Sequence, residues 1–263
     1  MPLLEYLQPL VVPFMFVLTR VTGVFLFTPV LTSAVIPRKY KALFAFMFAL
    51  AVFPQVSHLD QAADLSLDLP SIGVVMFSEL MIGVVLGLIA GLPMLAIQMA
   101  GFIMGYQMGL GLAQAYNPEM DGSDDVVSQL LFFMGMAVYL AAGGLDLVFL
   151  ALLGTFDNVP IGAFAASQAP LDLYVGLLSS GVELAIRIAA PVMGVILMAL
   201  LSMGFVMKTM PQINILSVGF AAKILAGLSI LAIVVGAIDF VIHEETLATL
   251  HELLIWTGVR GAE

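Results

Sequence analysis

Apolar residues dominate this chain in long runs that short polar connections separate. The runs cover about residues 10–33, 42–56, 71–93, 126–156, 174–206 and 215–242. A helix needs about 20 apolar residues to cross the hydrocarbon core of a bilayer, and most of these runs reach or approach that length. Lipid offers no hydrogen-bond partner to backbone N–H and C=O groups, and a helix satisfies them internally. We therefore predict an all-α membrane protein with about six long hydrophobic helices.

The segment GYQMGLGLAQAYNPEMDG, residues 105–122, departs from this pattern. Glycines recur at positions 105, 109 and 111, and Asn117-Pro118 interrupts the backbone. Irregular backbone at membrane depth is tolerated only where protein buries it or where it lines a cavity. We therefore predict a re-entrant, pore-lining segment from about residue 94 to residue 116. The alternative is a poorly helical span whose small residues pack against neighbouring helices.

The basic residues support this count of helices. Lys and Arg resist translocation, so the loop Arg38–Lys41 is expected in the cytoplasm. The connection with Asp60, Asp64 and Asp68 then lies outside, and Lys208 lies inside. This arrangement holds only if the segment 94–116 does not cross the membrane completely.

Composition narrows the function. Of the 263 residues, 62% are hydrophobic and 10% are charged, which is too few polar residues to cover a soluble domain of this size. The absence of cysteine excludes disulfides and thiol catalysis. The net charge of −10 speaks against nucleic acid and does not suggest electrostatic docking on anionic lipid. The first residues lack a basic n-region, and we interpret the first run as a retained helix.

Motifs for catalysis or cofactors are not evident. Gly109-Leu110-Gly111 resembles the start of a dinucleotide loop, but the third glycine is missing. His243-Glu244 begins a zinc-protease-like pattern in which Leu247 stands at the place of the second histidine. We therefore expect no enzyme activity, cofactor or metal.

Four ionisable residues in or beside the apolar runs are candidates for a functional role, because burial of a charge is costly. Arg20 is alone in the first run, and Glu79, nearer a helix end, is expected to extend towards water. Glu183 and Arg187 are four residues apart with the acid first, the favourable order on a helix. We expect this pair to neutralise itself, and a proton relay is the alternative.

The stretch KTMPQINILSVGFAAKILAGL, which begins at Lys208, resembles the FliR family of flagellar biosynthetic proteins, a family shared with virulence type III secretion systems. The matching residues assigned to a hairpin turn and to assembly are Lys208, Pro211, Gln212, Asn214 and Lys223. Pro211 is suited to end one helix and Asn214 to cap the next.

The resemblance extends in the right order over nearly the whole chain, through the stretches RVTGVFLFTPVLTSAVIPRKYK, SELMIGVVLG and QMAGFIMGYQMGLGLAQAYNPEMDG. Two places depart from the family pattern. Ala142-Gly143-Gly144 replaces an Asn-Gly-His, and a proline of the last hairpin is missing near Ala221-Ala222. These departures concern local contacts.

The resemblance implies a subunit of a helical export gate that forms with FliP and FliQ in the bacterial inner membrane, with FlhB associated and FlhA beneath. It implies a FliP-like part over residues 1–172 and a FliQ-like helical hairpin with a polar tail over residues 173–263. The assembled gate is expected to protrude towards the periplasm, so its helices need not span as hydropathy suggests.

The resemblance also implies that the segment 105–122 plugs a pore through which unfolded flagellar substrates pass. The residues assigned to this role are Gly105, Gln107, Met108, Gly109, Leu110, Gly111, Leu112, Tyr116, Asn117 and Pro118. Three alternatives stay open: a secondary transporter of small solutes, a purely structural assembly subunit, and a gate of the virulence type.

Overall fold

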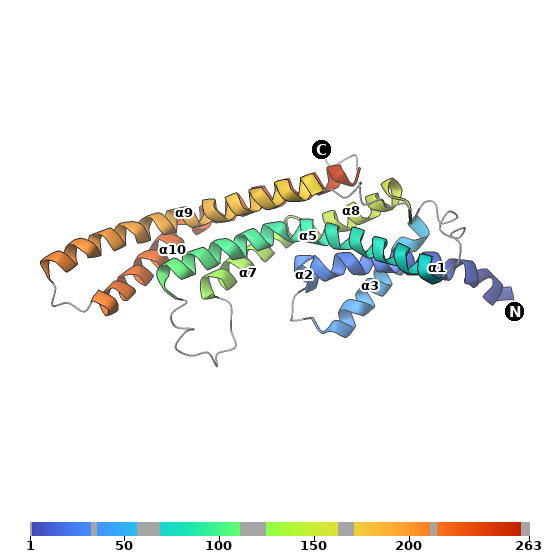
Figure 1. Ribbon diagram of the computed structural model, residues 1–263, viewed down its shortest axis with the longest axis horizontal. Helices are drawn as coiled ribbons and strands as arrows, with labels where there is room; N and C mark the ends of the chain where they lie inside the picture. The colour runs from blue at the N-terminus through green and yellow to red at the C-terminus, as the bar shows by residue number, and fades with distance from the viewer. Residues whose placement is uncertain are drawn as a thin grey trace. The chain divides into compact units, whose positions relative to one another are not determined.

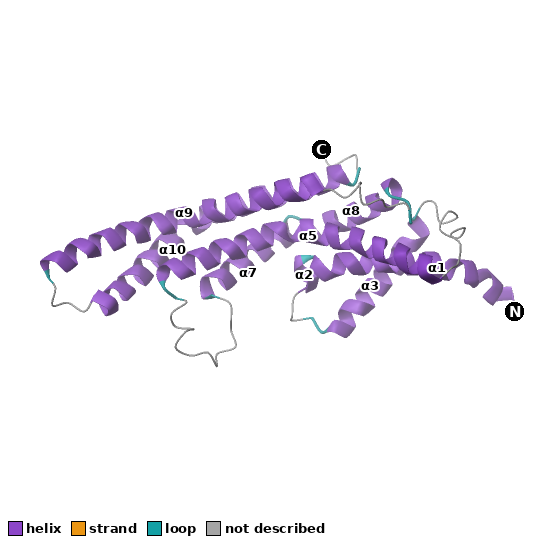
Figure 2. Ribbon diagram, in the orientation of Figure 1, coloured by secondary structure: helices purple, strands orange, loops and turns teal. Residues whose placement is uncertain are grey.

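The computed structural model describes residues 2–32, 36–56, 69–110, 125–162, 171–210 and 215–258. Within these ranges every regular element is a helix, as Figures 1 and 2 show. The elements are α1 (Pro2–Phe27), α2 (Pro29–Thr32), α3 (Arg38–Val52), the 3₁₀ turn η1 (Phe53–Gln55), α5 (Leu69–Met108), α7 (Val126–Ala141), α8 (Gly144–Asn158), α9 (Leu171–Thr209) and α10 (Ile215–Trp256). The prediction of an all-α membrane protein is confirmed.

Several helices are longer than a bilayer requires. α5, α9 and α10 contain 40, 39 and 42 residues, which corresponds to about 60 Å each at 1.5 Å per residue. In the described part of the chain, four helical segments are long and apolar enough to cross a membrane: Leu10–Phe27, Pro70–Met108, Tyr174–Thr209 and Val218–Trp256. α7 and α8, bent by 62° at their junction, make a fifth candidate if they count as one span. The count is therefore four or five, where the runs suggested about six.

Two of the apolar runs explain this difference. The run 42–56 forms the 15-residue helix α3 and then the short turn η1. The run 126–156 is interrupted at Gly143, whose φ of 70° lies in the left-handed region and ends the regular helix.

The glycine-rich segment also differs from the prediction. α5 continues through Pro93 to Met108, so residues 94–108 are helical, and the predicted irregular backbone over this range is wrong. A glycine inside a helix costs about 1 kcal/mol relative to alanine. Close packing of a neighbouring helix on these glycines, described below, offsets this cost.

The chain forms two compact units. Unit 1 contains residues 1–92, 143–177 and 247–263, and unit 2 contains residues 93–142 and 178–246. The predicted boundary after residue 172 lies next to the start of α9 at Leu171. The division into a FliP-like and a FliQ-like part stays a prediction.

Unit 1 has a core built from α1, α3, α5, α8 and the end of α10. α3 packs on α1 through its buried Ala45, Ala49 and Val52. Stacked rings of Phe48 and Phe149, 4.2 Å apart, join α3 to α8. The largest fully buried apolar side chains in this unit are Phe16, Phe156, Ile82, Leu86, Ile89 and Leu152.

Unit 2 contains the second half of α5, the helix α7 and most of α9 and α10. Its largest fully buried side chains are Ile97, Met104, Met108, Leu131 and Tyr139. α9 and α10 run side by side here (Figure 1) and expose many large apolar side chains, among them Leu197, Met198, Leu201, Phe205, Leu225 and Ile233. Apolar surface of this extent fits contact with lipid or with protein.

Candidate functional site

Glycines bring the backbones of α1 and α5 into direct contact in unit 1. A methyl group on Gly23 would lie 2.9 Å from the Cα of Gly83, and one on Gly83 would overlap the carbonyl group of Arg20. A methyl group on Gly87, one turn further along α5, would lie 2.8 Å from the carbonyl oxygen of Val24. Small residues four apart on one helix face allow such close approach within membranes. This approach brings the side chains of Arg20 and Glu79 within reach of each other.

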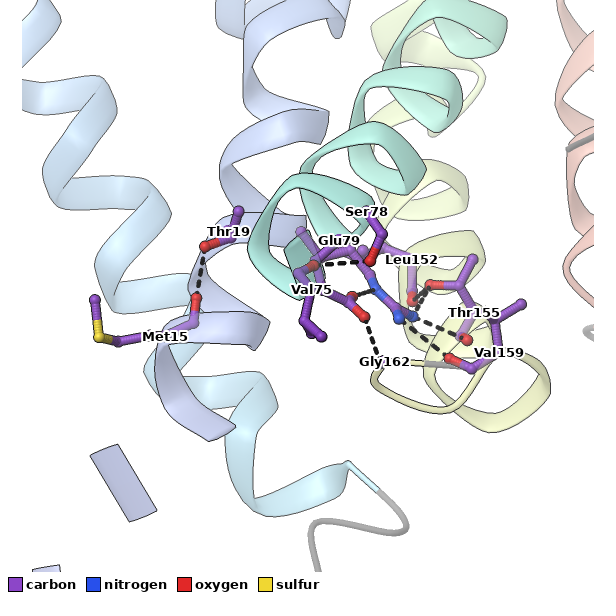
Figure 3. Close-up of polar contacts among 10 residues, drawn as sticks. Met15, Thr19, Val75, Ser78, Glu79, Leu152, Thr155, Val159 and Gly162 are labelled. Atoms are coloured by element: carbon purple, nitrogen blue, oxygen red, sulfur yellow. Dashed lines mark hydrogen bonds and ion pairs between the residues drawn. The ribbon is translucent and has the colours of Figure 1, made fainter. Parts of the chain in front are cut away.

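Arg20 of α1 and Glu79 of α5 form a buried ion pair. The Nε of Arg20 donates to the Oε2 of Glu79 at 2.6 Å, and both side chains are 0% exposed. Figure 3 shows Glu79 beside the end of α8. A buried charge is stable only when it is paired and its remaining donors or acceptors are satisfied.

The remaining donors of Arg20 bind the C-terminal end of α8. Nη1 donates to the carbonyl oxygen of Thr155 at 3.0 Å and to its hydroxyl oxygen at 3.2 Å. Nη2 donates to the carbonyl oxygen of Val159 at 3.1 Å, and the guanidinium lies 4.3 Å from the ring centroid of Phe156. The last carbonyls of a helix carry partial negative charge, and the Thr155 carbonyl accepts the N–H of Val159 as well as Nη1 of Arg20. Arg20 therefore caps α8 from a different helix.

Glu79 binds the turn that follows α8. Its Oε1 accepts a hydrogen bond from the backbone N–H of Gly162 at 3.0 Å (Figure 3). Gly162 has a φ of 79°, which glycine adopts without strain. We call Arg20, Glu79, Thr155, Val159 and Gly162 the clasp, because the two charged side chains together hold the end of α8 and its turn.

The clasp corrects one expectation. Glu79 is buried rather than extended towards water, and it pairs with Arg20, the one charged residue of the first apolar run. Position along an apolar run could not show the glycine contact that places the carboxylate against α1. Both Glu79 oxygens are engaged, and Nε, Nη1 and Nη2 of Arg20 all donate, so the geometry is that of a fixed structural link.

In the predicted pair of Glu183 and Arg187, the arginine contacts a different acid. Arg187 Nη1 lies 4.0 Å from Glu245 Oε1 of α10, and these side chains are 63% and 32% exposed. Among the ion pairs of the described residues, none joins Glu183 to Arg187, so the predicted pairing is wrong. The four-residue spacing cannot reveal a competing acid on another helix. An exposed pair at this distance contributes about 1 kcal/mol or less.

The end of α5 packs on the start of α7 in unit 2. A methyl group on Gly101 would come within 2.8 Å of the backbone nitrogen of Ser128, and one on Gly105 would overlap the carboxylate of Asp125. The Ser128 hydroxyl donates to the carbonyl oxygen of Gln98 at 3.0 Å. The two glycines therefore serve close helix packing.

Gly109 ends α5 in a left-handed conformation, with a φ of 87°. The N–H groups of Gly109 and Leu110 both donate to the carbonyl oxygen of Gly105, at 3.1 and 3.0 Å. This is a common way to end a helix and needs glycine at the turning position. A methyl group there would also lie 3.0 Å from the ring of Phe220 on α10.

Met108 and Asp125, which lie before and after residues 111–124 in the sequence, are both buried. Met108 is 0% exposed, and a methyl group on Gly227 would lie 2.7 Å from its side chain. Asp125 is 8% exposed, and its Oδ2 has no hydrogen-bond partner in the described part of the chain. Burial raises the pKa of this carboxyl above its ordinary value, and nearby backbone N–H groups of α7 only partly oppose the shift. We call Met108, Gly109, Asp125, Phe220 and Gly227 the flank cluster.

The predicted plug residues are thus partly located. Gly105, Gln107 and Met108 belong to α5, and Gly109 and Leu110 form the turn after it. Gly111, Leu112, Tyr116, Asn117 and Pro118 lie outside the described residues. Sequence reasoning did not place the other members of the flank cluster, Asp125, Phe220 and Gly227, at this site.

The sequence of this chain matches one family of known proteins. The family described as bacterial export proteins, family 1, matches residues 11–248. The chain belongs to this family. The match includes both the clasp and the flank cluster.

Proteins similar to this chain include FliR of two bacteria and a translocation protein of a third. The flagellar biosynthetic protein FliR of Bacillus subtilis is 26% identical over 252 residues, which cover 94% of this chain and 96% of that protein. The FliR of Caulobacter vibrioides is 27% identical over 76% of this chain and 78% of its own length. The Yop proteins translocation protein T of Yersinia pestis is 24% identical over 64% of each chain. The FliR resemblance inferred from the motifs is confirmed.

The hairpin residues of this export family member are only partly described. Lys208 lies in the last turn of α9, where a cation is favourable, and Lys223 is half-buried on α10. Pro211, Gln212 and Asn214 lie outside the described residues. The role of all five in assembly stays a prediction.

One cavity of about 450 Å³ opens in unit 1 between α8 and α10. Its lining is Leu147, Leu247, Ala248, His251 and Leu254. Within the described ranges, no three His, Asp or Glu side chains are grouped as a metal site requires. The cavity offers one polar side chain and is suited to an apolar occupant.

Proposed function

We propose that this chain is a core, non-enzymatic subunit of a flagellar type III protein export gate in the bacterial inner membrane. The observation that carries the proposal is the likeness to FliR of B. subtilis over 94% of the chain. FliP and FliQ are the proposed neighbours within the gate, with FlhB and FlhA as further partners, and the assembled gate would protrude towards the periplasm.

Within this proposal the segment after α5 seals the pore. The flank cluster supports this role, because the residues described on either side of 111–124 are closely packed: Met108 and Gly109 against α10, and Asp125 against Gly105 of α5. Leucine, methionine and tyrosine side chains of residues 105–118 would exclude water by apolar packing until a substrate displaces them. Methionine side chains adapt to varied surfaces and suit a seal that must reform.

Deletion of residues 111–120 tests the seal. Because Gly105 and Asp125 are in contact, residues 121–124 are long enough to close the shortened loop, at about 3.3 Å per residue. We expect the assembled gate to leak a small dye or ions, while the yield of the complex with its partner subunits is unchanged. A matched control deletes residues 61–66 from another connection and should leave the barrier tight.

The outcomes separate the candidate roles. A tight barrier after deletion of 111–120 would overturn the sealing role and leave the export role intact. A reduced yield without leakage would indicate a purely structural segment. Solute uptake by the purified chain alone in liposomes would support a secondary transporter instead.

A virulence-type gate is the second candidate, because the likeness to the Yop proteins translocation protein T covers 64% of the chain. Deletion of the gene in its own host distinguishes the two. Loss of motility and of flagellar filaments supports the flagellar form, and loss of secreted virulence proteins in a motile cell supports the other.

A further inference from the structure

The N-terminal end of α3 combines an unbalanced positive charge with an apolar face. Arg38, Lys39 and Lys41 are three of the chain's eight Lys and Arg residues, although the net charge is −10. No acidic residue occurs between Ile36 and Val56. Within the described residues, none of the three cations takes part in an ion pair. The local charge is therefore opposite to that of the whole chain.

One face of α3 packs against α1, and the opposite face is exposed. Ala45, Ala49 and Val52, at helical spacing, are buried against α1. The opposite face carries a stripe that starts beside the cations and continues along the helix: Tyr40, Leu43, Phe44, Met47 and Leu50, which are 47%, 56%, 59%, 57% and 47% exposed.

The order of these groups along the helix corresponds to the layers of a membrane. Arg38 and Lys39 are exposed at the first turn, Lys39 Nζ lies 5.2 Å from the ring centroid of Tyr40, and the apolar stripe follows. Tyrosine and basic side chains favour the headgroup region, and leucine, phenylalanine and methionine favour the acyl chains. Along α3, about 22 Å long, the side chains that favour headgroups therefore precede those that favour acyl chains.

We propose that this end of α3 is a docking surface for anionic phospholipid. The headgroup phosphate binds among Arg38, Lys39 and Lys41, and an acyl chain lies along the stripe from Leu43 to Leu50. Guanidinium and ammonium groups both bind phosphate, the first in a bidentate manner and the second as a point charge. The unbalanced cations select an anionic headgroup over a zwitterionic one, which the stripe alone would not do. The proposal does not depend on the export function.

The test measures lipid retention by the full-length chain. Detergent-purified protein is mixed with equal amounts of phosphatidylglycerol and phosphatidylcholine, and the bound lipids are counted by native mass spectrometry. We expect a preference for phosphatidylglycerol of about ten-fold or more, since each basic side chain at an anionic surface contributes roughly a factor of five. The triple variant Arg38→Gln/Lys39→Gln/Lys41→Gln should bring the preference close to one.

Two controls keep the test specific. The charge-conserving variant Arg38→Lys/Lys39→Arg/Lys41→Arg should keep most of the preference, and Lys208→Gln/Lys223→Gln, which removes charge elsewhere, should keep all of it. Circular dichroism of each variant confirms that the helix content is unchanged. An equal preference in the wild type and the triple glutamine variant would overturn the proposal and indicate that neutral lipid or a protein subunit covers this face. An equal loss in the Lys208/Lys223 variant would also overturn it, because the effect would then be one of net charge.

Discussion

Arg20 is a charged side chain with no exposed surface, and its place in the fold depends on all its contacts together. Its guanidinium binds a carboxylate of α5 and two backbone carbonyls and a hydroxyl at the end of α8. Removing one partner of a buried pair leaves the other charge unsatisfied, whereas replacing both by apolar groups is much less harmful. This asymmetry gives the clasp a distinctive response to mutation.

Arg20→Met is expected to destabilise unit 1 by about 3–5 kcal/mol, because Glu79 then remains buried without its partner. The double variant Arg20→Met/Glu79→Leu should recover part of this loss. The reversed pair Arg20→Glu/Glu79→Arg should not recover it, since a carboxylate at position 20 cannot donate to the carbonyls of Thr155 and Val159. Thermal unfolding in detergent measures all three, and full recovery by the reversed pair would contradict the capping role of Arg20.

The buried carboxyl of Asp125 is expected to make the free energy of unfolding depend on pH. Its pKa in the folded chain is raised above the ordinary value of 3.8, so the folded state holds the proton more tightly than the unfolded state does. The favourable contribution is complete below pH 3.8 and is lost as the pH rises through the folded-state pKa. Asp125→Asn should therefore be more stable than the wild type at neutral pH, with a difference that shrinks towards pH 4.

Unfolding midpoints between pH 4 and pH 8 check this prediction for Asp125. The same substitution at the exposed Asp239 is the control. A gain for Asp125→Asn that stays constant over the whole pH range would mean that charge burial is not its cause.

At the scale of elements, the glycines of α5 differ in whether a neighbouring helix packs closely against them. Gly83, Gly101 and Gly105 each face another backbone or side chain at distances too short for a methyl group, while Gly73 in the same helix has nothing within 4 Å. The same residue type therefore serves close packing at some positions of α5 and has no contact to serve at another.

Gly83→Ala is expected to force α1 away from α5, to lengthen the Arg20–Glu79 contact and to destabilise the chain by about 1–3 kcal/mol. Gly73→Ala should instead stabilise by about 0.5–1 kcal/mol, because alanine loses less backbone entropy in a helix. Unfolding of both variants under the same conditions provides a matched comparison. Equal effects of the two would refute direct contact between α1 and α5.

The helical class and the outlines of most helices follow from the apolar runs, because membrane burial and backbone pairing leave little choice. The C-terminal limit of α5 could not be predicted from the sequence. Its glycines and Pro93 locally disfavour a helix, and packing against α7 stabilises that helix. The clasp could be predicted only in part. Arg20 and Glu79 were identified as candidates from the sequence, but their ion pair joins residues 59 positions apart and could not be predicted. Asp125 gave little signal, because an aspartate before a helix is ordinarily an exposed cap.

At the scale of the whole molecule, α9 and α10 expose polar groups amid apolar surface. Glu183, Arg187 and Asp239 are all exposed on helices that are otherwise strongly apolar. A charged side chain at the centre of a bilayer costs about 2.5–3.5 kcal/mol or more. Protein partners or enclosed water would remove this cost, as the proposed gate provides.

The chain expressed without partner subunits should therefore be degraded rapidly in membranes. Glu183→Leu/Arg187→Leu should extend its lifetime when it is alone and lower the yield of the complex when partners are present. Pulse-chase labelling with and without the partner subunits measures both effects. A long-lived, protease-resistant wild-type chain in the absence of partners would contradict the expectation.

The clasp also determines the order in which contacts can form during synthesis of the chain. Arg20 is made 135 residues before Thr155, the carbonyl that it caps, and ribosomes add about 5–20 residues per second. For roughly 7 to 27 s the nascent chain carries an arginine whose carbonyl acceptors at the end of α8 do not yet exist, although Glu79 follows Arg20 by 59 residues. The hydrogen bonds of Arg20 are complete only when α8 has been made, so α1 can reach its final place only after α8 has emerged.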